Sequence, residues 1–201
     1  MAAVSESIVR EFFELNGFLV RQHRKHIAPN RQAEDDDDID FFVLNPHPKT
    51  SDGALPFILS SGDLPFVQRA IVVVKGGHTE TFSTARMTSA PEIFRFVEPK
   101  AFEQAALAFG ADGAPLKILV IPSLPRNSKG RDESVALLRA KGVDGVLPFR
   151  TMLAALVAET KINRNYQKSD LLQIIRILKT YDFIKESQLE LFKSSGKKPK
   201  R

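Results

Sequence analysis

The sequence has no cysteine, which excludes disulfide bonds, thiolate zinc sites and a cysteine nucleophile. It also has no apolar run near the ~20 residues that a helix needs to cross a bilayer. Residues 1–6 carry neither the basic start nor the apolar stretch of a secretory signal. Any chemistry must therefore use oxygen or imidazole groups, and we expect a cytoplasmic protein.

Several sequence motifs with a known mechanism are missing as well. The chain contains no GxGxxG, P-loop, GxSxG or HExxH pattern, and no internal repeat is visible. Dinucleotide-binding, nucleotide-hydrolysing, esterase-type and zinc-protease functions thus have no support from motifs.

Composition indicates an ordinary globular chain. Its 201 residues are 43% hydrophobic and 26% charged, which suits one core with a helical appendage. We expect a core over residues 1–150, a helical extension over 151–190 packed on that core, and a disordered basic tail over 191–201. The net charge of +5 favours phosphate binding, although a solvated basic tail explains much of the excess more simply.

Hydrophobic periodicity predicts alternating helices and strands. A first helix begins at a Ser5 cap and ends at Asn16-Gly17. Expected strands cover 18–25, 39–44, 70–75, 117–122 and 143–149. Expected helices cover 132–141, 151–160 and 171–184, and another begins at Ser89 with Glu92 in a capping box. Residues 26–38 and 46–65 read as loops, the second with a short extended piece at 57–59. This order predicts an α/β sandwich.

Asp40 and Lys75 stand out within these strands. A carboxylate in an apolar strand costs several kcal/mol unless it is paired or binds a metal, although Asp40 could simply cap the strand end. Strand 70–75 is almost continuously apolar, so we expect it at the centre of the sheet with Lys75 at its end. Alternation places Ile71, Val73 and Lys75 on one face, and Asp38 beside Asp40.

These two strands resemble the PD-(D/E)xK nuclease superfamily, which has the restriction-endonuclease-like fold. The resemblance spans roughly residues 5–122 and implies an αβββαβ core with a mixed central sheet flanked by helices. It assigns Asp40 as the metal-binding aspartate, Lys75 as the catalytic lysine and Glu11 as the glutamate of the first helix. Glu11 fits better than Glu14, because it flanks the apolar stripe of that helix.

The sequence departs from this family at Val73, where the motif requires a second carboxylate to hold magnesium. Glu92, Glu80 or Asp38 could supply that ligand from nearby. Capping explains Glu92 equally well, and Glu80 could simply lie on the surface. The implied cofactor is magnesium, and the catalytic candidates are Asp40, Lys75, Glu11 and Glu92.

Basic residues provide candidate contacts to nucleic acid. One group is Arg21, Arg24 and Lys25 at the end of the strand 18–25, and another is Arg164 and Lys168 before the last helix. His78 follows the Lys75 strand, where simple exposure is the plainer interpretation. The last helix is more apolar than a solvated helix needs, so we expect it to pack on the core or to form a homodimer.

Three hypotheses follow. We favour a catalytically lapsed protein that binds nucleic acid, in which Val73→Glu could restore metal affinity. The first alternative is an active magnesium-dependent DNA endonuclease with a migrated acidic ligand. The second is a structural or protein-interaction module, in which Asp40 and Lys75 form an internal ion pair.

Overall fold

The computed structural model describes residues 2–22, 39–50, 53–99, 102–103, 109–110 and 114–184. Two compact units make up the chain, Met1–Leu156 and Val157–Arg201. The expected loop over 26–38, the residues Arg24, Lys25 and Asp38, and the tail over 191–201 lie outside the described residues.

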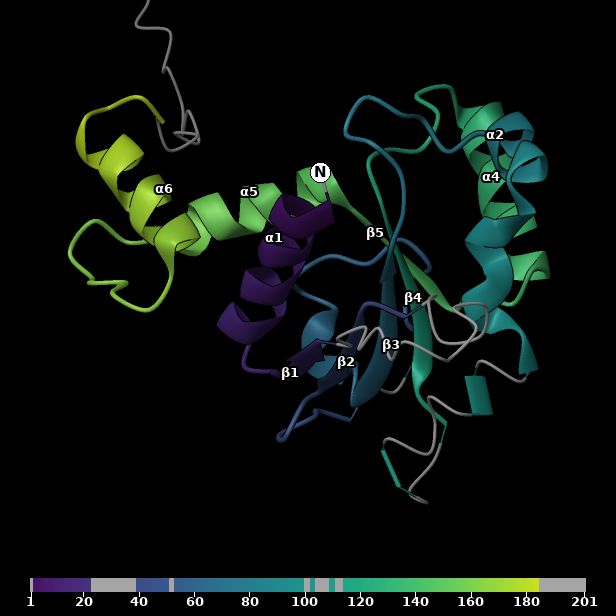
Figure 1. Cartoon of the computed structure of the whole chain (residues 1–201), viewed down its shortest axis with the longest axis horizontal. Helices are drawn as coiled ribbons and strands as arrows, with labels where there is room; N and C mark the ends of the chain where they lie inside the picture. The colour runs from purple at the N-terminus through teal and green to yellow at the C-terminus, as the bar shows by residue number, and fades with distance from the viewer. Residues whose placement is uncertain are drawn as a thin grey trace, which may run out of the picture. The chain divides into compact units, whose positions relative to one another are not determined.

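The first unit is built on a five-stranded sheet in the order β1-β2-β3-β4-β5 (Figure 1). The strands are β1 (Leu19–Gln22), β2 (Phe41–Leu44), β3 (Arg69–Val74), β4 (Leu116–Ile121) and β5 (Gly145–Pro148). The pairs β1–β2 and β2–β3 are antiparallel, whereas β3–β4 and β4–β5 are parallel. The expected α/β class with a mixed sheet is therefore confirmed.

The strand β3 lies at the centre of this sheet, as its apolar run predicts. Its first five residues are buried, because β2 and β4 flank it and helices cover both faces. Beyond β5, the segment Phe57–Leu59 adds a short extended piece, as expected. Leu59 N–H donates to Val146 O at 2.8 Å, and Val146 N–H donates to Phe57 O at 2.8 Å.

Helices of the first unit lie on both sides of its sheet. The helices of the described residues are α1 (Ala2–Leu15), α2 (Thr84–Ser89), α4 (Ser128–Ala140), α5 (Phe149–Glu159) and α6 (Asp170–Thr180), with 3-10 helices η1 (Leu64–Phe66) and η2 (Pro91–Val97). The helix α6 belongs to the second unit. In Figure 1, α1 lies on one side of the sheet and α2 and α4 lie on the other. The apolar cluster on the α2 side contains Ile71 and Val73 of β3.

Three expected helix starts differ from the structure. The first helix begins at Ala2, so Ser5 lies inside it and does not cap it. Ser89 ends α2 and donates its hydroxyl to Arg86 O at 2.9 Å. The next helix, η2, has Ala90 at its N-cap and no side-chain cap, so the Ser89–Glu92 capping box was wrong. The helix α4 begins at Ser128 because Asn127 caps it, accepting from Gly130 N–H at 2.7 Å.

Other expected helix ends are confirmed. Gly17 has a φ of +83°, the left-handed conformation that glycine supplies after a helix. Ser169 caps α6 by accepting from Leu172 N–H at 3.2 Å. In the same unit, the buried Lys179 donates to Thr160 O at 2.8 Å, and this bond ties α6 to the residue that follows α5. Packing of α6 on the core or on a second copy of the chain stays a prediction.

Candidate functional site at the carboxyl edge

The candidate residues Asp40, Lys75 and His78 lie where β3, β4 and β5 end. Parallel strands end at one edge of a sheet, and ligands of α/β proteins commonly bind there. Because β2 runs antiparallel to β3, its start lies at the same edge. We call this place the carboxyl edge and define it by Asp40, Lys75, the turn 76–80, Ser123 and Phe149.

Asp40 extends the pairing of β2 with β3 beyond the last strand residue. Its N–H donates to Val72 O at 3.1 Å, and its carboxylate Oδ2 accepts from Val74 N–H at 2.7 Å. A side-chain oxygen thus takes the place of a backbone carbonyl in the ladder. Asp40 has a structural function at the strand end, in agreement with the simpler of its two interpretations.

Asp144 makes the same arrangement at the opposite edge. Its N–H donates to Lys117 O at 2.9 Å, and its Oδ2 accepts from Lys117 N–H at 2.8 Å. Asp144 is exposed and Asp40 is half-buried. Asp144 is therefore a matched structural control for Asp40.

Loss of the Asp40 carboxylate is expected to weaken the fold. In Asp40→Ala the Val74 N–H loses its acceptor in a half-buried place, which should lower the free energy of unfolding by about 1–2 kcal/mol. Asp40→Asn keeps an oxygen acceptor and should cost less, as should Asp144→Ala at the exposed position. Urea denaturation measures the free energy of unfolding of the three variants. Wild-type stability in Asp40→Ala would contradict the ladder function.

Lys75 and Val73 have different surroundings although both are expected on one face of β3. Lys75 is half-buried, and its N–H donates to Val120 O at 3.0 Å, which continues the pairing with β4. Val73 is 0% exposed and lies in the apolar cluster with Phe82, Leu119 and Ile121. The position at which the resembled family has its second acid is therefore part of the core.

On α1, the two glutamates differ as their helical positions predict. Glu11 is half-buried beside the apolar face, whereas Glu14 is exposed and pairs with Arg10 at 2.7 Å. Glu11 stays the better candidate of the two.

His78 connects the turn after β3 to two helices. Its Nε2 lies 3.2 Å from Ser5 Oγ of α1, and its ring meets the Phe149 ring edge-on, with centroids 4.8 Å apart. Ser5 is buried. Although His78 is an exposed residue, these contacts position it, so simple exposure does not describe it fully.

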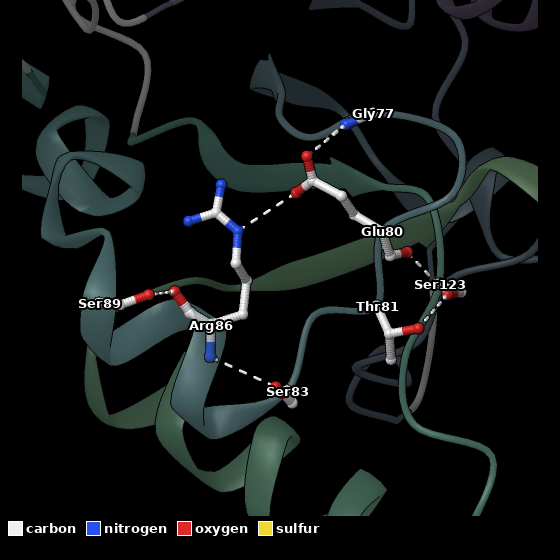
Figure 2. A network of polar contacts seen from close by, with 7 residues as sticks. All are labelled: Gly77, Glu80, Thr81, Ser83, Arg86, Ser89 and Ser123. Carbon is white, nitrogen blue, oxygen red and sulfur yellow. Dashed lines mark hydrogen bonds and ion pairs between the residues drawn. The ribbon is translucent and has the colours of Figure 1, made fainter.

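Glu80 holds the rest of this turn together through a polar network (Figure 2). Its Oε1 accepts from Gly77 N–H at 3.2 Å, and its Oε2 pairs with Arg86 Nε of α2 at 3.2 Å. Its carbonyl accepts from Ser123 Oγ at 3.0 Å. The Gly77 N–H bond, together with Arg86, lowers the pKa of Glu80 from its usual value near 4.5.

This shifted pKa predicts how the turn responds to acid. Because the pKa is lowered in the folded state, the stabilisation by Glu80 is complete above the ordinary glutamate pKa and is lost as pH falls through the lowered pKa. Glu80→Gln keeps an oxygen acceptor without the charge. The melting temperature of wild type should exceed that of the variant at neutral pH and converge with it in acid. A difference that does not depend on pH would contradict this.

The described acids do not fit a magnesium site of the resembled kind. Among the described residues no group of three or more His, Cys, Asp or Glu side chains could hold a metal ion. The Glu80 carboxylate accepts from Gly77 N–H and pairs with Arg86, and Glu92 is exposed on η2. Asp40 lies at the expected place, and one of its oxygens accepts from the backbone N–H of Val74.

The basic candidates are spread over both units. Arg21 is exposed on β1, which ends at the carboxyl edge because Gln22 pairs with Phe41. Arg164 and Lys168 are exposed in the second unit. Of the described nucleic-acid candidates, Arg21 and His78 thus lie at or near the carboxyl edge, where the catalytic candidate Lys75 adds a further cation.

Two parts of this edge were missed from the sequence. The short helix α2 has a readable signal, because Ser83 precedes a stretch without glycine or proline and accepts from Arg86 N–H at 3.3 Å. The Glu80–Arg86 pair has no such signal, since a turn and a helix start separate the two residues.

Comparison with protein-family models, with curated proteins and with solved structures found no match. No helix among the described residues is long and apolar enough to span a membrane. Any function for this chain must therefore be argued from its own residues.

Proposed function

We propose that this protein binds nucleic acid on a nuclease-like α/β scaffold and does not hydrolyse it. The order of the elements supports the scaffold. The helix α1 precedes the antiparallel strands β1, β2 and β3, and β4 returns parallel to β3 after α2 and η2. This is the αβββαβ order that the resemblance to PD-(D/E)xK nucleases implies.

The burial of Val73 is the observation that carries the absence of hydrolysis. Magnesium in the resembled family needs a carboxylate at this place, and here the side chain is 0% exposed within an apolar cluster. This position therefore belongs to the packed core and does not hold a metal ligand. Of the candidate replacement acids that the structure describes, Glu80 bonds Gly77 and Arg86, and Glu92 is exposed.

Retained positive charge supports binding. Lys75 lies at the end of β3 and Arg21 is exposed on β1 near the same edge, within a chain of net charge +5. Cations of this kind attract phosphates irrespective of base sequence, and salt weakens such binding.

A salt titration with matched variants tests this function. Wild type should bind labelled single-stranded and duplex DNA and RNA in EDTA, with affinity falling as salt rises. Lys75→Ala should weaken binding several-fold and reduce the salt slope by about 1. Lys49→Ala removes an exposed lysine from the loop after β2, away from the carboxyl edge, and should change neither.

Each result decides between the hypotheses. Equal losses of nucleic-acid affinity in Lys75→Ala and Lys49→Ala would show that the carboxyl edge is not the binding surface. No binding of any nucleic acid at low salt would favour a protein-interaction module.

A further inference from the structure

Arg69 is a buried arginine at the opposite edge of the sheet from Lys75. It is the first residue of β3, pairs with Leu44 of β2 and is 8% exposed. Its Nε is buried and has no hydrogen-bond partner. A guanidinium stays ionised at all ordinary pH values, so burial cannot be relieved by loss of a proton.

A second cation lies beside it on the neighbouring strand. Lys117 of β4 pairs with Ile71, which is two residues after Arg69 on β3. Arg69, Ile71 and Lys117 therefore share one face of the sheet. From strand spacing and rise, the two Cα atoms lie about 8 Å apart, so both long side chains can reach one ion between them.

Neither cation is neutralised by a described acid. The ion pairs Arg10–Glu14, Arg86–Glu80 and Lys129–Glu133 involve neither residue. The Lys117 ammonium lies 4.3 Å from the centre of the Phe102 ring. Asp144 is the acid that contacts Lys117, and its carboxylate bonds the backbone N–H.

We propose that Arg69 and Lys117 bind the oxyanion group of a small ligand, in the first instance a phosphate. A buried guanidinium nitrogen without a hydrogen-bond partner is costly, and an oxyanion offers the paired acceptors that a guanidinium fork matches. The ligand is small because a guanidinium this deeply buried cannot meet the backbone of a nucleic-acid duplex. The site lies at the other end of β3 from the proposed nucleic-acid surface and is independent of it.

Thermal unfolding of the full chain with inorganic phosphate tests this site. Phosphate stabilises many proteins by exclusion from their surface, so the measured quantity is the phosphate-induced rise in melting temperature of each variant relative to wild type. Wild type should show an additional, saturating rise that is absent in Arg69→Met. Arg69→Lys keeps the charge without the guanidinium fork, so it should lose most of this saturating rise.

The substitution of Lys117 has a matched control at Lys141. Lys117→Met should weaken the saturating response, whereas Lys141→Met should not, although Lys141 also lies over a phenylalanine ring, 5.8 Å from the centre of Phe94. Binding of phosphate by calorimetry should follow the same order. Nucleic-acid binding should be unchanged in Arg69→Met.

Acetate at equal ionic strength identifies the chemistry of the group. A larger response to phosphate assigns a phosphate-bearing ligand, and a larger response to acetate assigns a carboxylate. The proposal is overturned if neither ion gives a saturating response in wild type, or if Arg69→Met responds as wild type does.

Discussion

Replacement of Val73 by glutamate is expected to destabilise the protein severely without creating a metal site. The valine is 0% exposed among Phe82, Leu119 and Ile121. A carboxylate placed there is buried without a partner, which costs about 3–5 kcal/mol. Urea denaturation should show this loss, and calorimetry should detect no magnesium binding by any folded fraction.

Val73→Thr provides the matched control, because threonine keeps the volume of valine and adds one hydroxyl. It should cost about 1–3 kcal/mol, less than the glutamate. If Val73→Glu is as stable as wild type and binds magnesium, the position opens onto a site and the chain is closer to an active nuclease. That result would restore the expectation drawn from the sequence.

Gly76 directly follows Lys75 in the chain. Gly76→Ala is expected to cause the second largest loss of stability. Gly76 has a φ of +88°, and a Cβ added there would lie 2.6 Å from Phe82 Cε2 and 3.2 Å from Pro122 Cδ. Left-handed strain and overpacking together should lower the free energy of unfolding by about 2–4 kcal/mol. Urea denaturation checks the loss, and nucleic-acid affinity should fall because Lys75 and His78 shift.

Gly17→Ala separates strain from packing. Gly17 has a φ of +83°, but an added Cβ meets no atom within 4 Å. It should cost roughly 1 kcal/mol from conformation alone. Equal losses at Gly17 and Gly76 would mean that Phe82 moves freely and does not fix the turn.

The sheet was largely predictable from sequence because its signals are local. Apolar runs marked β3 and β4, and the continuous run of β3 correctly placed it at the centre. Glycine and serine marked the end of α1 and the start of α6 for reasons of backbone conformation and hydrogen bonding. Ser89 followed the same rule and was wrong, because Ser83 had already started a helix that Ser89 ends.

The candidate site was predictable only in part. The sequence singled out Asp40 and Lys75 in two expected strands, but it did not show that the two residues meet. The antiparallel pairing of β2 and β3 brings both to one edge of the sheet. Pattern alone did not show that the Asp40 carboxylate bonds Val74 N–H, that Glu80 pairs with Arg86, or that His78 contacts Ser5. Such side-chain contacts join distant segments, and no periodicity records them.

The central claim is tested most directly by measuring whether a bound oligonucleotide keeps its full length. Wild-type protein is incubated with magnesium and end-labelled DNA or RNA at concentrations that saturate binding, and the products are separated on a denaturing gel. We predict that the nucleic acid is bound and remains intact. Magnesium-dependent cleavage that disappears in both Asp40→Asn and Lys75→Ala would contradict it and establish an active nuclease.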